Sequence, residues 1–89
     1  MTNLALDETS TRLIRAVRAE AARAGIDGKA LAVNGLKRDP KYVYERYRLE
    51  KPFTTKDLAQ IANFLGITVE DIIKSASLEA QRQKQEVAA

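Results

Sequence analysis

The residues best suited to chemistry lie in one short segment, 36–52, with the sequence LKRDPKYVYERYRLEKP. This segment holds all three tyrosines and six of the fifteen Lys and Arg residues of the chain. Ammonium, guanidinium and phenol groups donate hydrogen bonds to phosphates and to base edges, and tyrosine rings can pack on thymine methyl groups. The segment therefore predicts contact with a polyanion.

A short helix is expected to carry these groups. Asp39 is a good N-cap, and Pro40 suits the first helical position because its missing N–H costs nothing there. At about 100° per residue, Val43 and Tyr47 share one face and should point to a core. The helix should end near Leu49. A narrow apolar stripe beneath a basic, aromatic outer face is what reading of the major groove requires.

Five side chains on or beside the outer face are predicted to contact bases: Lys41, Tyr42, Tyr44, Glu45 and Arg48. Lys41 and Arg48 can donate hydrogen bonds to guanine, and Glu45 can accept one from cytosine. Phosphate contacts, which position a protein on DNA without reading its sequence, are predicted from five basic residues: Lys29, Lys37, Arg38, Arg46 and Lys51. For each residue, an ordinary solvated surface position is the alternative.

The charge distribution along the chain agrees with such a partner. The net charge of +3 combines −2 over residues 1–11, +3 over 12–29, +3 over 37–51 and −1 over 53–89. Basic charge thus gathers in the first half of the chain, and a local field of one sign attracts polyanions. The alternative interpretation is a solvated helical surface.

Composition limits the fold and excludes most catalytic chemistry. With 89 residues, 45% hydrophobic and 30% charged, the chain is expected to form one small all-α domain. It contains no Cys and no His, which removes disulfides, thiolate nucleophiles and the usual zinc ligands. Paired carboxylates and a glycine-rich phosphate loop are also absent from the sequence pattern. We therefore expect no enzyme activity and no cofactor.

Neither a membrane-spanning run nor a signal-peptide pattern is present, so the expected location is the cytoplasm, without a membrane partner.

Two further helices are expected in the first half of the chain. Residues 9–24 have the apolar spacing of an amphipathic helix, which Gly25 can end. Asp27 can cap a shorter helix over 28–34, although its glycines weaken that pattern.

The second half has clearer helix starts. Thr54 and Asp57 form a Thr-x-x-Asp capping pattern, and an equivalent pair follows at Thr68 and Asp71. Phe53, before the first cap, should be a buried staple against the new helix. The predicted apolar stripes of these two helices are Leu58, Ile61, Ala62 and Leu65, and then Val69, Ile72, Ile73 and Ala76. After Ser77 the sequence favours helix but lacks an apolar stripe, so a helical or frayed tail is expected.

The pattern from Glu50-Lys51-Pro52-Phe53-Thr54 to Asp71-Ile72-Ile73 resembles lambda-repressor-like helix-turn-helix domains, as in phage repressors, Cro-type proteins and antitoxins. The resemblance implies an all-α, five-helix DNA-binding domain over residues 10–77. It is preceded by an N-terminal arm, 1–9, and followed by a C-terminal tail, 78–89.

The sequence departs from the family at the turn. Gly35-Leu36 looks like the family's Gly-Val pair, but Lys37 and Arg38 are then extra before the Asp39 cap. Counting back from Val43 instead places Lys37 on the family's glycine. Either the turn is longer than usual or the second helix is distorted.

By position, the family's base-contacting places fall on Pro40, Lys41, Tyr44 and Glu45. Pro40 has no donor, so Lys41 becomes the principal reader, followed by Arg48.

The resemblance implies a sequence-specific transcriptional regulator that binds a double-stranded DNA operator in a bacterial host. Within the family, the chain looks most like small actinobacterial phage immunity repressors, which implies a phage immunity repressor or a Cro-type repressor. The alternative is an antitoxin or a small protein-binding adaptor with the same fold. The sequence leaves open a monomer or a homodimer. It also leaves open whether Glu86-Val87-Ala88-Ala89 is a degradation signal, with an ordinary frayed end favoured.

Overall fold

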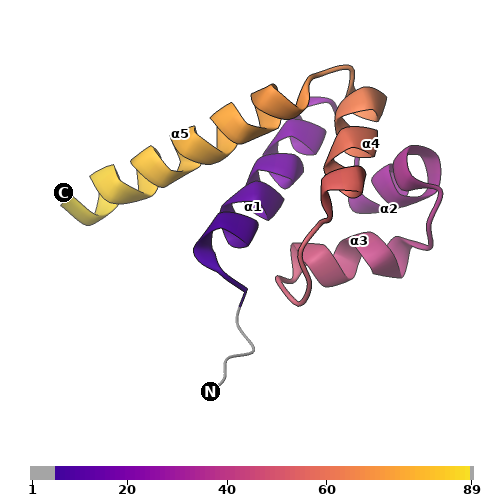
Figure 1. Cartoon of the computed structure of the whole chain (residues 1–89), viewed down its shortest axis with the longest axis horizontal. Coiled ribbons are helices and arrows are strands. Elements are labelled where there is room, and N and C mark those ends of the chain that lie inside the picture. The colour runs from indigo at the N-terminus through magenta and orange to yellow at the C-terminus, as the bar shows by residue number, and fades with distance from the viewer. Residues whose placement is uncertain (1–5, 89) are drawn as a thin grey trace.

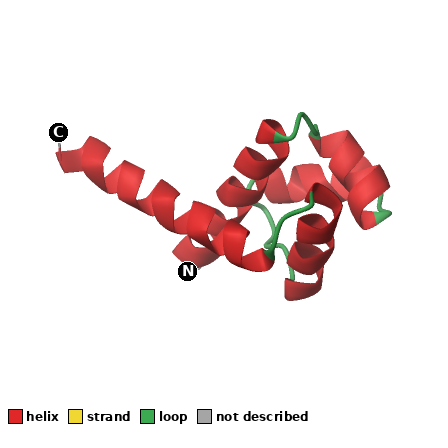
Figure 2. Cartoon of the chain, turned by 90° about the horizontal axis from the view of Figure 1, so that it is seen from above, coloured by secondary structure: helices red, strands yellow, loops and turns green. Residues whose placement is uncertain are grey.

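The computed structural model describes residues 6–88, in which every regular element is a helix (Figures 1 and 2). The helices are α1 (Glu8–Arg23), α2 (Gly28–Ala30), which continues directly into a π-helical turn η1 (Leu31–Leu36), α3 (Pro40–Tyr47), α4 (Thr55–Leu65) and α5 (Val69–Ala88). Taking α2 and η1 as one helix, the structure confirms the predicted all-α, five-helix fold. None of these helices is long and apolar enough to span a bilayer.

α1 begins slightly earlier than the sequence predicts. The Asp7 carboxylate accepts a hydrogen bond of 2.7 Å from the Ser10 N–H, and bonding from Ser10 lowers the pKa of Asp7. The last residues of the predicted N-terminal arm, 1–9, therefore belong to α1. Residues 1–5 of that arm, like Ala89 of the proposed degradation signal, lie outside the described residues.

The core collects apolar side chains from all five helices. Its largest fully buried members are Ile14, Val17, Leu31, Val43, Ile61 and Ile72. Phe53 is also buried, as its staple position predicts. Ile73 was predicted to lie in the apolar stripe of the last helix, but 51% of it is exposed, so that prediction is wrong. α5 buries Ile72 and Ala76, and a turn of about 100° per residue leaves Ile73 at the edge of that stripe.

Both predicted capping boxes are present. Asp57 N–H donates to Thr54 Oγ1 and Thr54 N–H donates to Asp57 Oδ2, each at 3.0 Å. The equivalent distances between Thr68 and Asp71 are 3.0 and 2.9 Å. These reciprocal bonds satisfy backbone N–H groups that a helix start would otherwise leave unpaired.

In the described part of the chain, four helices close with a residue of left-handed backbone conformation: Gly25, Lys37, Leu49 and Gly66. At three of these helix ends, the backbone N–H of the next residue donates to the carbonyl oxygen five residues before it: Ile26 to Ala21, Glu50 to Glu45 and Ile67 to Ala62. In helix two the bond runs from Arg38 to Ala32, six residues earlier, at 2.9 Å. The end of helix two is therefore one residue wider than the others.

α5 passes along α1 and then leaves the body of the molecule, while α2, α3 and α4 gather on the other side (Figures 1 and 2). It runs without interruption through residue 78, so the predicted tail is present in its helical form up to Ala88.

Candidate nucleic-acid interface

α2 with η1, the turn at residues 37–39 and α3 form a helix-turn-helix. Lys37 takes the left-handed conformation, with φ of 57°, and its N–H donates to the Ala32 carbonyl. Lys37 therefore stands where the family has its glycine, and a distorted second helix is the correct alternative. The match of Gly35-Leu36 to the turn is wrong. Gly35 lies within η1, where an added Cβ would come within 3.0 Å of the Phe64 ring.

α3 begins as its sequence predicts. Lys41 N–H donates to the Asp39 carboxylate at 2.9 Å, and Pro40 is the first helical residue. Val43 is fully buried and anchors the inner face. Tyr47 packs partly against the core, and burial raises the pKa of its hydroxyl.

The start of α3 and the start of α2 form one surface. Lys41 is exposed at the second position of α3, and Tyr44 is 39% exposed. The Tyr44 ring lies against Gly28, where an added Cβ would come within 2.7 Å of Cε1. Because Gly28 has no side chain, Tyr44 can lie over the start of helix two, next to exposed Lys29. The Tyr44 ring thus contacts the start of helix two, and exposed Lys41 precedes it by one turn of α3.

Arg46 is a correction to the predicted set. The sequence placed it at an exposed helix edge, but only 8% of it is exposed. Its guanidinium lies 3.5 Å from the centre of the Tyr42 ring and donates to the Tyr42 carbonyl at 2.9 Å. Residues four apart on a helix are neighbours, so a flat guanidinium can cover the ring of the preceding turn. A buried Arg46 has no free path to a phosphate.

Glu45 is also less accessible than predicted, with 17% of its side chain exposed. Its Oε1 lies 3.6 Å from Arg46 Nη1 and 3.7 Å from Lys51 Nζ. The carboxylate therefore interacts with cations of its own chain, while the Lys51 side chain remains largely exposed.

Arg48 lies beyond α3, because the helix ends at Tyr47 and Leu49 adopts the left-handed conformation. As the C-cap residue it still donates its N–H to the Tyr44 carbonyl at 2.9 Å, and 56% of its side chain is exposed. Its Nε donates to Glu50 Oε2 at 2.8 Å, and this bond raises the pKa of Arg48 and lowers the pKa of Glu50. Any base contact from Arg48 requires this exposed pair to open.

Tyr42 points into a polar contact with α4. Its hydroxyl donates to Asp57 Oδ2 at 2.6 Å, and burial together with this bond raises the pKa of Tyr42. Tyr42 was predicted to contact bases, but its hydroxyl is engaged inside the protein. Asp57 is the site residue that sequence reasoning missed, because its capping pattern was visible but its contact with Tyr42, fifteen residues away, was not.

No protein-family model matches the sequence, and no curated protein matches it either. Among solved structures, the chain is similar to two crystal structures of the clp gene regulator ClgR from Corynebacterium glutamicum. One has a TM-score of 0.73 at 25% identity and covers 93% of this chain and 88% of that chain. The other has a TM-score of 0.70 at 24% identity and covers 83% and 94%. The chain has the fold of a gene regulator.

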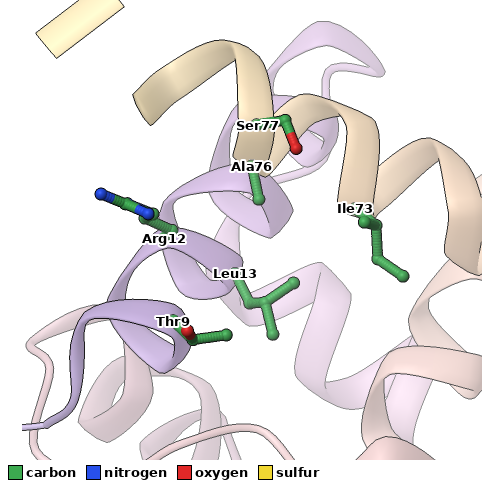
Figure 3. Close-up of a pocket in the computed structure, with 6 residues that line it drawn as sticks. All are labelled: Thr9, Arg12, Leu13, Ile73, Ala76 and Ser77. Carbon is green, nitrogen blue, oxygen red and sulfur yellow. The ribbon is translucent and has the colours of Figure 1, made fainter. Parts of the chain in front are cut away.

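This likeness agrees with the expectation that the protein is not an enzyme. Among the side chains that the structure describes, no three His, Cys, Asp or Glu residues are grouped so that they could hold a metal ion. An open hollow lies elsewhere, between α1 and α5, with a volume of about 540 Å³ (Figure 3). Leu13, Ile73 and Ala76 form its apolar lining, with Thr9, Arg12 and Ser77 beside them. This groove carries no catalytic combination of side chains.

Proposed function

We propose that the protein is a sequence-specific, double-stranded DNA-binding transcriptional regulator. The observation that carries this proposal is the helix-turn-helix, whose α3 is anchored by buried Val43 and presents Lys41 and Tyr44 outward. The fold shared with a gene regulator supports the same conclusion.

We assign direct reading first to Lys41, which can donate to guanine O6 and N7, and next to Tyr44, which can pack on a thymine methyl group. Exposed basic residues around them suit phosphates: Lys29, Lys37, Arg38 and Lys51. Glu45 and Arg48 can join only by exchanging their internal ion pairs for contacts with bases.

Within this class, a phage immunity repressor or Cro-type protein that occludes a promoter in the bacterial cytoplasm is the favoured subtype. The sequence resemblance to that group supports it. An antitoxin or adaptor is the second candidate, because the apolar groove between α1 and α5 and exposed Ile73 offer a surface for a partner protein.

Fluorescence anisotropy tests the proposal, with the duplex that flanks the gene and a scrambled duplex of equal length. The wild type should bind the first duplex more tightly, and log affinity should fall steeply with log salt. Lys41→Ala should cost about 1 to 3 kcal/mol on the preferred duplex and far less on the scrambled one.

Lys74→Ala is the matched control, because Lys74 is an exposed lysine on α5, away from α3. Equal losses on both duplexes would reduce Lys41 to a phosphate contact. A wild type without salt-dependent duplex binding would favour the protein-binding alternative.

A further inference from the structure

We propose that Tyr42 is a positioning residue whose ring holds the Arg38 guanidinium in place for a DNA phosphate. This inference rests on the proposed DNA binding and assigns Tyr42 a role different from base reading. The ring acts as the platform, and the hydroxyl fixes the platform to the next helix.

The platform is fixed from α4. Tyr42 Oη and the Thr54 N–H both donate to Asp57 Oδ2, at 2.6 and 3.0 Å. Asp57 is only 3% exposed, so its carboxylate depends on these donors in place of water. The same oxygen atom therefore joins the start of α4 to the first turn of α3, and the Tyr42 ring cannot turn freely.

Arg38 is held at both ends. Its backbone N–H donates to the Ala32 carbonyl at 2.9 Å, which fixes the chain just before α3. Its guanidinium carbon lies 4.6 Å from the centre of the Tyr42 ring, a cation–π distance, while the residue remains exposed. A long arginine side chain loses much rotamer freedom when it binds, and restraint before binding removes part of that cost.

Two guanidinium groups lie over the Tyr42 ring, those of Arg38 and Arg46, and they differ in exposure. Arg46 lies closer to the ring, at 3.5 Å, but is buried and bonded to the Tyr42 carbonyl. Arg38 is thus the member of the pair that a phosphate can reach. Its place in the turn, directly before the start of α3, is suited to contact with the DNA backbone beside the groove.

The test measures affinity for one duplex over a range of salt concentrations, below the melting temperature of every variant. Arg38→Ala should lower affinity about fivefold and the salt slope by about one unit. In a Tyr42→Leu background, which lacks the ring, Arg38→Ala should cost less than about twofold, because contacting residues are not additive. Tyr42→Phe keeps the ring but loses its bond to Asp57, so there Arg38→Ala should cost about threefold, between the other two values.

Arg38→Lys provides a second measurement on a surface residue whose replacement leaves the core intact. It keeps the charge but loses the flat guanidinium, so it should lower affinity nearly as much as Arg38→Ala. Wild-type affinity in Arg38→Lys would overturn the proposal. The proposal would also be overturned if Arg38→Ala lowered affinity about fivefold in the Tyr42→Leu background. It would likewise be overturned if Arg38→Ala cost no more in Tyr42→Phe than in Tyr42→Leu. If the wild type shows no salt-dependent binding, the proposed function itself fails.

Discussion

The two sides of the molecule are held together by different forces. Where α3 meets α4, a hydrogen bond from the Tyr42 hydroxyl to the buried carboxylate of Asp57 fixes the contact. Where α1 meets α5, apolar side chains such as Val17 and Ile72 hold the two helices together, and an open apolar groove lies beside them. Hydrogen bonds are directional and apolar burial is not. The helix that we propose to bind DNA is thus held to α4 by a directional contact.

The largest effect should come from breaking the apolar side. Ile72→Ala removes a fully buried side chain of α5 and should lower the free energy of unfolding by about 3 kcal/mol. Ile73→Ala, its neighbour, is half-exposed and should cost about 1 kcal/mol or less. Urea denaturation of the two variants provides the measurement. Equal losses would mean that Ile73 also belongs to the core.

A smaller loss is expected on the polar side. Asp57→Ala removes a cap and also leaves the Tyr42 hydroxyl without its acceptor, so it should cost about 2 kcal/mol or more. Asp71→Ala removes only an exposed cap and should cost about 1 kcal/mol. The two aspartates occupy the same position in their capping boxes, which makes the pair a matched comparison. If thermal melts show the same loss of stability for both variants, the bond from Tyr42 to Asp57 does not contribute to stability.

A gain in stability is expected at the turn. Lys37 has a φ of 57°, which costs a residue with a Cβ about 1 kcal/mol, so Lys37→Gly should stabilise the fold by about that amount. Lys37→Ala loses the same charge but keeps the unfavourable backbone, so it should bring no gain. Chemical denaturation separates the two variants. Identical stabilities would mean that the charge and not the backbone matters.

The smallest effect is expected from removing residues 79–89. Among the described side chains of α5, Ile72 and Ala76 are buried, and the deletion leaves both in place. The melting temperature should change by no more than about 2 °C. Analytical ultracentrifugation should show the same number of chains per particle for the full-length and the shortened protein. A dimer that becomes a monomer on deletion would instead show that the end of α5 is an assembly element.

Local signals in the sequence predicted the fold well. Each helix start depends on residues no more than four positions apart, and the caps at Asp39, Thr54 and Thr68 formed as expected. The candidate site was less predictable. The bond from Tyr42 to Asp57 spans fifteen residues, and the burial of Arg46 depends on the ring beneath it. Helical periodicity assigns a residue to a face, but the final contacts depend on which neighbouring helix covers that face.

The wide end of helix two affects the direction, around the helix axis, in which the chain leaves that helix. An ordinary helix behaves as a screw, so one inserted residue rotates everything beyond it by about 100°. The turn at η1 closes through the carbonyl of Ala32 and takes up one more residue within the same revolution. One turn of helix two thus holds more residues than an α-helical turn does. This wider turn sets the angle at which the chain leaves helix two and enters α3.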